Sequence, residues 1–209
     1  ASPMAEKVDV LASKGEINFW GNKVKVIEME SEKGAIATVH GALQAGVLAT
    51  TYTASQGLLL MIPSIYKMAG EMLPGVIHVA ARSLSTHSLS IFGDHQDIYA
   101  VRQTGACMLS SSSVEEAYHM AMVSHLASIK SSLPFINFFD GFRTSHEIDK
   151  VKEIDLSKLE TLIDKKALRK FRDNGMISGA TTRGTAENED VYFQHTESRN
   201  GYYIKAIDN

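Results

Sequence analysis

Four polar residues are placed where they could do chemistry. Glu32 precedes a segment with helical spacing, and Arg82 directly follows an apolar, strand-like run. Thr53 and Gln56 belong to a Thr-Ala-Ser-Gln-Gly turn. A carboxylate can move a proton, hydroxyl and amide groups can bind a polar ligand, and a guanidinium can hold a carboxylate bidentately. Helix-dipole stabilisation, turn chemistry and a structural salt bridge are the competing explanations for the same residues.

Two other groups of residues are weaker candidates. His87, Asp94 and His95 concentrate titratable groups, but their spacing fits no metal template, so we predict no metal site in this chain. The loop from Asp140 to Glu147 could line a site, although a subunit contact is favoured. The single cysteine, Cys107, cannot alone hold an iron–sulfur cluster or a structural zinc ion and is predicted to be a small core residue.

The elements that would position these groups alternate along the chain. Short runs rich in apolar and β-branched residues predict strands at 24–29, 49–53, 76–80, 106–109 and 135–139. Segments with helical spacing predict helices at 35–48, 57–72 and 113–129, the second bent or restarted at Pro63 and the third begun by a Ser113/Glu116 capping box. This alternation predicts an α/β fold with a doubly wound, mainly parallel sheet and helices on both faces. Its functional groups should lie beyond the carboxyl ends of the strands.

The composition changes after residue 150. We expect an α/β domain over 1–150, and a C-terminal helix (about 156–171) with an extended arm of the same domain over 151–209. The start, Ala1-Ser2-Pro3, resembles a cut or processed end, so the chain is expected to be a fragment with a truncated start.

The overall composition argues against two classes of partner. The 209 residues carry a formal charge of −3, with a pI near 6.3, and lack a long basic cluster, so we expect no nucleic-acid binding. The longest apolar stretch, Leu58–Ile62, is too short to cross a bilayer, so we expect no membrane association. A cytoplasmic location is the default expectation.

Five strings of residues, in order along nearly the whole chain, closely resemble the first domain of the pyruvate:ferredoxin (flavodoxin) oxidoreductase family. They are Glu28–Glu32, His40–Leu43, Thr53–Met61, Ser90–His95 and Phe138–Glu147. The resemblance implies a thiamine-diphosphate-binding fold of the pyrimidine-domain type. It also implies an enzyme that converts pyruvate and coenzyme A to acetyl-CoA and carbon dioxide, with electrons passed to ferredoxin or flavodoxin.

The same resemblance implies roles for individual residues. Glu32 matches the family glutamate that contacts the aminopyrimidine ring of thiamine diphosphate, where a carboxyl group favours the tautomer able to deprotonate the thiazolium carbon. Arg82 matches the arginine that holds the substrate carboxylate, and Thr53 and Gln56 are expected to help bind the cofactor. A family Tyr-Pro-Ile-Thr-Pro segment, which supplies a further substrate contact, would lie just upstream of Ala1.

Other parts expected of such an enzyme do not occur in these residues. The Gly-Asp-Gly motif that helps hold Mg²⁺ and the diphosphate is missing, as are the cysteine runs that bind [4Fe-4S] clusters. Both are expected in the remaining domains of a homodimeric enzyme, so the fragment alone should be inactive. Two alternatives stay open: a related 2-oxoacid:ferredoxin oxidoreductase, or a non-catalytic docking domain in which Glu32 and Arg82 pair with each other or with a partner.

Overall fold

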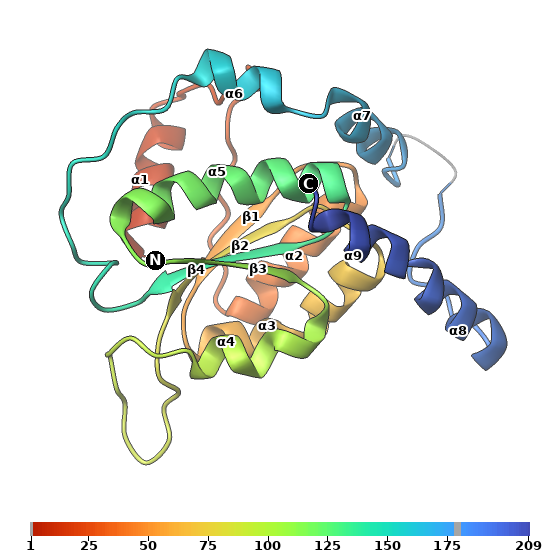
Figure 1. Cartoon of the computed structure of the whole chain (residues 1–209), viewed down its shortest axis with the longest axis horizontal. Helices are drawn as coiled ribbons and strands as arrows, with labels where there is room; N and C mark the ends of the chain where they lie inside the picture. Colours follow the sequence, from red (N-terminus) through yellow and green to blue (C-terminus); the bar gives the residue numbers. More distant parts are fainter. Residues whose placement is uncertain (1, 178–180) are drawn as a thin grey trace.

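A parallel sheet forms the centre of the protein in a computed structural model that describes residues 2–177 and 181–209 (Figure 1). Within these residues the sheet has four strands in the order β1-β2-β4-β3. The strands are β1 (Thr50–Thr53), β2 (Val76–Ala81), β3 (Cys107–Ser111) and β4 (Phe135–Asp140). These four predicted strands are therefore confirmed, with ends shifted by at most two residues.

Complete burial explains the apolar character of the two central strands. Every residue of β2 is buried, and so is every residue of β4 except the last, as expected for parallel strands covered on both faces. Side chains of a strand alternate between its faces, and neighbouring strands pair in register, so Tyr52, His78 and Asn137 form one row across the sheet. This row is the polar part of an otherwise apolar layer.

Helices cover both faces of the sheet, as predicted for a doubly wound fold (Figure 1). One side carries α2 (Glu32–Gln44), α3 (Gln56–Gly70) and α4 (Gln96–Val101), whose apolar side chains join the main core with Ile77, Val79 and Ile136. The other side carries α5 (Val114–Ser131), which packs on β3 and β4. A short 3₁₀ turn, η1 (Arg102–Thr104), connects α4 to β3.

Two helix details refine the expectations. Pro63 lies inside α3 without interrupting it, so the helix does not restart there. The Ser113 hydroxyl accepts a hydrogen bond from the Glu116 backbone N–H at 3.1 Å, as a capping box requires. The Glu116 carboxylate closes the box one residue earlier than predicted, because it accepts from the backbone N–H of Ser112 at 2.7 Å.

The strand predicted at 24–29 is wrong. These residues run as an extended, largely exposed segment after α1 (Ser2–Ser13), and no strand pairs with them in the part of the chain that the structure describes. Strand-type residues form a strand only when a neighbour supplies hydrogen-bond partners. No backbone group of the described residues forms a hydrogen bond with residues 24–29.

The C-terminal region is also more helical than expected. The single helix predicted at 156–171 is two helices, α6 (Leu156–Leu162) and α7 (Lys165–Asp173), because Asp164 caps a new start by accepting from Ala167 N–H at 2.8 Å. The predicted arm contains α8 (Glu189–Ser198), which projects from the body, and α9 (Asn200–Ala206), which packs on α5 (Figure 1). The boundary at residue 150 stays a prediction.

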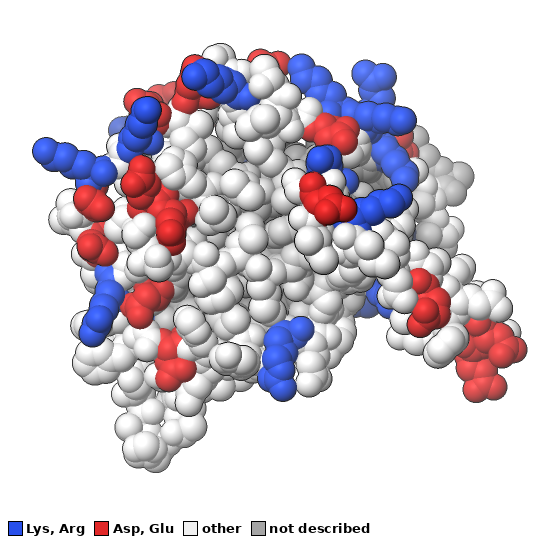
Figure 2. Space-filling view, viewed as in Figure 1, with Lys and Arg blue, Asp and Glu red and all other residues white. Residues whose placement is uncertain are grey.

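The surface carries no large field of one sign on the face seen in Figure 2. Lys and Arg are interspersed with Asp and Glu around its rim, and its centre is uncharged. Among the described residues, no helix combines the length and the apolar character needed to span a bilayer.

Candidate active site at the carboxyl end of the sheet

The candidate residues lie at one edge of the sheet because all four strands are parallel. Thr53 ends β1, Arg82 follows β2, and Asp140 ends β4. The segments that leave these strands are fastened to one another rather than spread into solvent. In parallel α/β sheets this is the edge at which ligands bind.

Asp97 joins the ends of β1 and β2. Its carboxylate accepts hydrogen bonds from the backbone N–H groups of Ser55 at 2.9 Å and Arg82 at 3.1 Å, and also from Ile98 at 2.8 Å. The side chain is fully buried, and this burial raises the pKa of Asp97, opposed in part by the hydrogen bonds from backbone N–H groups. Asp97 therefore fixes the positions of the two turns that carry Thr53, Gln56 and Arg82.

Glu32, Thr53 and Gly57 meet at the start of two helices. Ser31 caps α2, which makes Glu32 its first residue. A Cβ atom at Gly57 would lie 2.6 Å from Thr53 Oγ1 and 2.9 Å from Glu32 Oε1, so only glycine leaves room for both groups. Thr53 Oγ1 is buried and has no hydrogen-bond partner within the described residues. A buried hydroxyl without a partner is costly and points to a missing ligand.

Gln56 is held away from this group by its own contacts. Its amide nitrogen donates to the Ser85 carbonyl at 2.8 Å, and its amide oxygen accepts from the Ser55 hydroxyl at 2.6 Å. Ser55 has a positive φ of 49°, an uncommon conformation that costs about 1–3 kcal/mol in a residue with a side chain. The turn after β1 is therefore strained and tied to the loop that follows β2.

Arg82 points toward the end of β4. Its Nε donates to the Gly141 carbonyl at 2.9 Å, and its terminal Nη groups have no partner in the described parts of the chain. Arg82 and Glu32 form no ion pair with each other in these parts of the chain. The free Nη groups can still bind a carboxylate.

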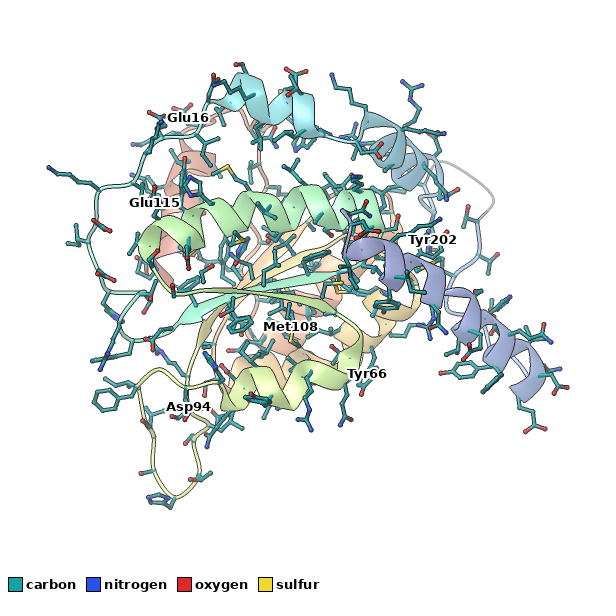
Figure 3. The ribbon with its side chains drawn as sticks, viewed as in Figure 1. Glu16, Tyr66, Asp94, Met108, Glu115 and Tyr202 are labelled. Atoms are coloured by element: carbon teal, nitrogen blue, oxygen red, sulfur yellow. The ribbon has the colours of Figure 1, made fainter. Side chains whose placement is uncertain are left out.

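The loop between β2 and α4 packs against the segment after β4. Phe92 contacts Phe142 with ring centroids 4.7 Å apart, and Gly93 lies so close to the Asp140 carboxylate that a side chain there would clash. Asp94 lies at the base of this loop (Figure 3) and accepts from the Gln96 N–H at 3.0 Å. Residues 2–177 and 181–209 contain no group of three or more His, Cys, Asp or Glu that could hold a metal ion.

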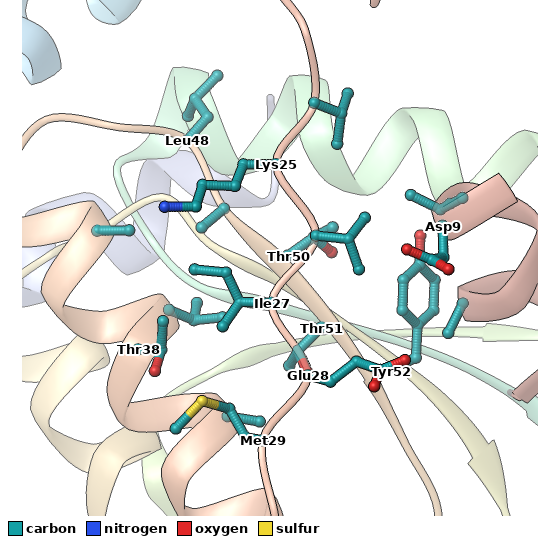
Figure 4. A pocket seen from close by; sticks show the side chains of 18 of the residues that line it. Asp9, Lys25, Ile27, Glu28, Met29, Thr38, Leu48, Thr50, Thr51 and Tyr52 are labelled. Atoms are coloured by element: carbon teal, nitrogen blue, oxygen red, sulfur yellow. The ribbon is translucent and has the colours of Figure 1, made fainter. Parts of the chain in front are cut away.

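A large cavity lies elsewhere in the described residues. It has a volume of about 1260 Å³ and lies between α1, α2 and β1 (Figure 4). Glu32 lines it, but Thr53, Gln56 and Arg82 do not. We therefore place the candidate site at the strand ends, where the polar groups converge, and not in this cavity.

Two positions that shape this site were not singled out from the sequence. Asp97 had a detectable signal, since it precedes Ile98 on the apolar side of a short helix, where a lone carboxylate needs partners. Gly57 had none beyond being part of the turn, because its role is visible only when Thr53 and Glu32 meet in space. The structure supports a polar ligand between the first turns of α2 and α3.

Comparison with known proteins agrees with the fold and with the motifs. Residues 1–208 match the family described as pyruvate flavodoxin/ferredoxin oxidoreductase, thiamine diphosphate-binding. A pyruvate-flavodoxin oxidoreductase of Enterobacter agglomerans is 57% identical over 98% of this chain, and a pyruvate:ferredoxin oxidoreductase of Moorella thermoacetica is 55% identical over 98%. The chain spans about 18% of the length of each of these two relatives.

A solved structure supports the fold independently. The 2-oxoglutarate:ferredoxin oxidoreductase of Magnetococcus marinus aligns over all of this chain and 40% of its own, with a TM-score of 0.68 at 18% identity. The resemblance found in the sequence motifs is confirmed by the family match over 208 of the 209 residues. The chain belongs to the thiamine-diphosphate-binding domain family of the pyruvate flavodoxin/ferredoxin oxidoreductases.

Proposed function

We propose that this chain binds the aminopyrimidine part of thiamine diphosphate and the substrate carboxylate in an enzyme that oxidatively decarboxylates pyruvate. The observation that carries the proposal is the meeting of the Glu32 carboxylate with the unpartnered Thr53 hydroxyl over Gly57. The family match and the pyruvate oxidoreductase relatives support it.

The residues fit the polar edge of a pyrimidine ring. Glu32 would face a ring nitrogen and Thr53 would offer its free hydroxyl, while Gly57 keeps the space beside both open. We keep Gln56 in the proposed site, where its amide must give up its bond to Ser85 to reach a ligand. Thiamine diphosphate, when bound, supplies the electron sink for breaking the carbon–carbon bond of a 2-oxo acid.

The work assigned to this chain is proton transfer and positioning. Glu32 holds and moves a proton at the ring nitrogen, a general acid–base role that typically contributes about 10²–10⁴-fold to rate. Arg82 binds the substrate carboxylate through its free Nη groups and so selects a small 2-oxo acid. Asp97 keeps the turns that carry both sides of the site in register.

The rest of the reaction belongs to parts outside these 209 residues. We propose that the remaining domains of the same polypeptide hold Mg²⁺ and [4Fe-4S] clusters, and that the enzyme uses coenzyme A and ferredoxin or flavodoxin as a cytoplasmic homodimer. A related 2-oxo acid in place of pyruvate is the alternative that substrate profiling decides.

The test uses the complete parent protein. Pyruvate- and coenzyme-A-dependent reduction of an artificial electron acceptor is measured for the wild type, for Glu32→Gln and for the neighbouring control Glu30→Gln, at saturating thiamine diphosphate. We expect a loss of about 10²–10⁴-fold for Glu32→Gln and near-normal activity for the control. Near-normal activity of Glu32→Gln would refute the proposed role.

A further inference from the structure

The loop that follows β4 lies against the end of β2. Gly141 donates its backbone N–H to the Ala81 carbonyl at 2.9 Å, and the Gly141 carbonyl accepts from Arg82 Nε at 2.9 Å. A Cβ atom at position 141 would lie 2.6 Å from the carbonyl oxygens of both Ala80 and Ala81, so only glycine allows this close approach. The loop therefore brings a backbone acceptor to the side chain of Arg82.

The Gly141 carbonyl has a second donor, the hydroxyl of Ser145, whose Oγ lies 2.7 Å away. His146 Nδ1 lies 2.9 Å from the same Oγ and 2.7 Å from the Phe142 carbonyl. Because a carbonyl can only accept, His146 Nδ1 must carry a proton, and Ser145 is left to donate its own proton to Gly141. The carbonyl that Arg82 uses is thus held by a side chain that comes from the same loop.

Further contacts hold this loop in one conformation. The Asp140 carboxylate accepts from the Phe142 backbone N–H at 2.8 Å, and the Asp140 carbonyl accepts from the Ser145 backbone N–H at 3.1 Å. The Phe142 ring packs on Phe92, and Gly141 itself is buried. The position of the Gly141 carbonyl is therefore set before any ligand arrives.

The bond to Gly141 decides which edge of the Arg82 guanidinium is available. A guanidinium can bind a carboxylate bidentately through Nε and one Nη group, or through its two Nη groups. Gly141 occupies Nε, while both Nη groups lack a partner in the described parts of the chain. The backbone N–H of Arg82 is held as well, by Asp97 at 3.1 Å. Only the edge formed by the two Nη groups is left for a ligand.

We propose that Ser145 is a positioning residue for substrate binding: through the Gly141 carbonyl it holds the Arg82 guanidinium so that the two Nη groups receive the substrate carboxylate. The inference rests on the proposed role of Arg82. An arginine that is already ordered loses less side-chain entropy when it binds a ligand, so this contact should strengthen the binding of pyruvate. It also gives the loop from Asp140 to Glu147 a function in the site itself.

Steady-state kinetics of the complete parent protein tests the proposal, with pyruvate varied at saturating thiamine diphosphate and coenzyme A. We expect Ser145→Ala to raise the KM for pyruvate about three- to tenfold, the effect of one hydrogen bond, and to change kcat by less than about twofold. Ser145→Thr keeps the hydroxyl and should restore the KM. The control Ser131→Ala loses a similar bond, 2.6 Å to the Ala127 carbonyl, near the amino end of β4, and should leave the KM unchanged.

A double-mutant cycle separates positioning from a purely structural role of Ser145. Arg82→Ala should raise the KM for pyruvate about 10–100-fold, as expected for the loss of a hydrogen-bonded charge. Adding Ser145→Ala to Arg82→Ala should raise it no further, because the residue through which Ser145 acts is gone. Additive effects of the two substitutions would show that Ser145 only stabilises its loop, and would overturn the proposal.

The remaining outcomes distinguish this inference from the proposed function. A raised KM in Arg82→Ala with a normal KM in Ser145→Ala would overturn the positioning role and leave the proposed function intact. A normal KM in Arg82→Ala would refute the proposed role of Arg82, and the inference with it. If Ser145→Ala does not fold, Ser145→Cys replaces it, since a thiol of similar size is a weak donor. Its KM should also rise, and a normal KM would overturn the proposal.

Discussion

The carboxyl end of β1 and its outer edge differ in how many of their backbone groups have hydrogen-bond partners. At the carboxyl end, Asp97 takes up the N–H groups of Ser55 and Arg82, and Gln56 and Ser55 bind the following loop. Along the outer edge, β1 faces a cavity and a segment without backbone hydrogen bonds. At the carboxyl end, contacts within these residues hold the candidate site in place, whereas no described strand pairs with the outer edge of β1.

The largest expected effect is at the satisfied end. Asp97→Ala leaves three backbone N–H groups, those of Ser55, Arg82 and Ile98, without this acceptor. At about 1–3 kcal/mol for each, the free energy of unfolding should fall by at least about 3 kcal/mol. Asp94→Ala in the same region, where the side chain is exposed, should cost at most about 1 kcal/mol. Urea denaturation of the chain, followed by circular dichroism, measures both. Equal effects would show that Asp97 does not organise the turns.

Gly57→Ala tests the close approach of Glu32 and Thr53. The new methyl group would overlap both side chains and displace the Glu32 carboxylate, so activity of the parent enzyme should fall about 100-fold. The control Gly41→Ala is a helical glycine with open space around its Cβ position and should stabilise by about 0.5–1 kcal/mol without loss of activity. Steady-state kinetics of the two variants separates crowding at the site from a general effect of adding a methyl group.

His78 links the polar row inside the sheet to the pH dependence of stability. Burial first, and the charge of His125 second, lower the pKa of His78 from 6.5 to about 3. Below pH 6.5, His78 is therefore protonated in the unfolded chain but stays neutral in the folded chain. The free energy of unfolding consequently falls as the pH drops from 6.5 toward 3.

Between pH 6 and 4, His78 should contribute about 1.4 kcal/mol of lost stability per pH unit. This contribution should disappear in His78→Gln and persist in His87→Gln, an exposed histidine. Denaturation at a series of pH values measures it, and parallel curves for the wild type and His78→Gln would contradict the assignment.

Thr53→Val should have the smallest effect on folding. Its hydroxyl has no partner among the described residues, so its removal should change the free energy of unfolding by less than about 0.5 kcal/mol. Cofactor affinity of the parent enzyme should instead weaken by about tenfold, the value of one hydrogen bond. Thr50→Val loses a 2.7 Å hydrogen bond to the Val76 carbonyl. It should therefore lower the free energy of unfolding and leave the cofactor affinity unchanged. Calorimetric titration with thiamine diphosphate and urea denaturation compare the two.

The sequence predicted elements whose partners lie within the 209 residues. The apolar run at 135–139 is β4 because β2 and β3 flank it, and Ser113 begins α5 because its cap is local. The same rules failed at 24–29, where the residues favour a strand but no described strand pairs with them. They also failed at Asp164, whose capping bond divides a helix that amphipathic spacing had joined.

The candidate site could be predicted only in part, for a related reason. Glu32, Thr53, Gln56 and Arg82 lie at strand or helix ends as expected, and Glu32 and Thr53 do come together. Three features depend on contacts between residues distant in sequence. They are the approach of Glu32 and Thr53 at Gly57, the hydrogen bond from Gln56 to Ser85, and the buried hydrogen bonds of Asp97. Local patterns do not encode such contacts.

The most direct test of the account measures proton exchange at the thiazolium C2 position of thiamine diphosphate bound to the parent enzyme. Quenched-flow deuterium exchange, followed by NMR, compares the wild type with Glu32→Gln while cofactor occupancy is kept saturating. We predict exchange slower by about 10²–10⁴-fold in the variant, because the role proposed for Glu32 is to control the proton on the ring that performs the deprotonation. An unchanged exchange rate at full occupancy would contradict the claim that Glu32 activates the cofactor.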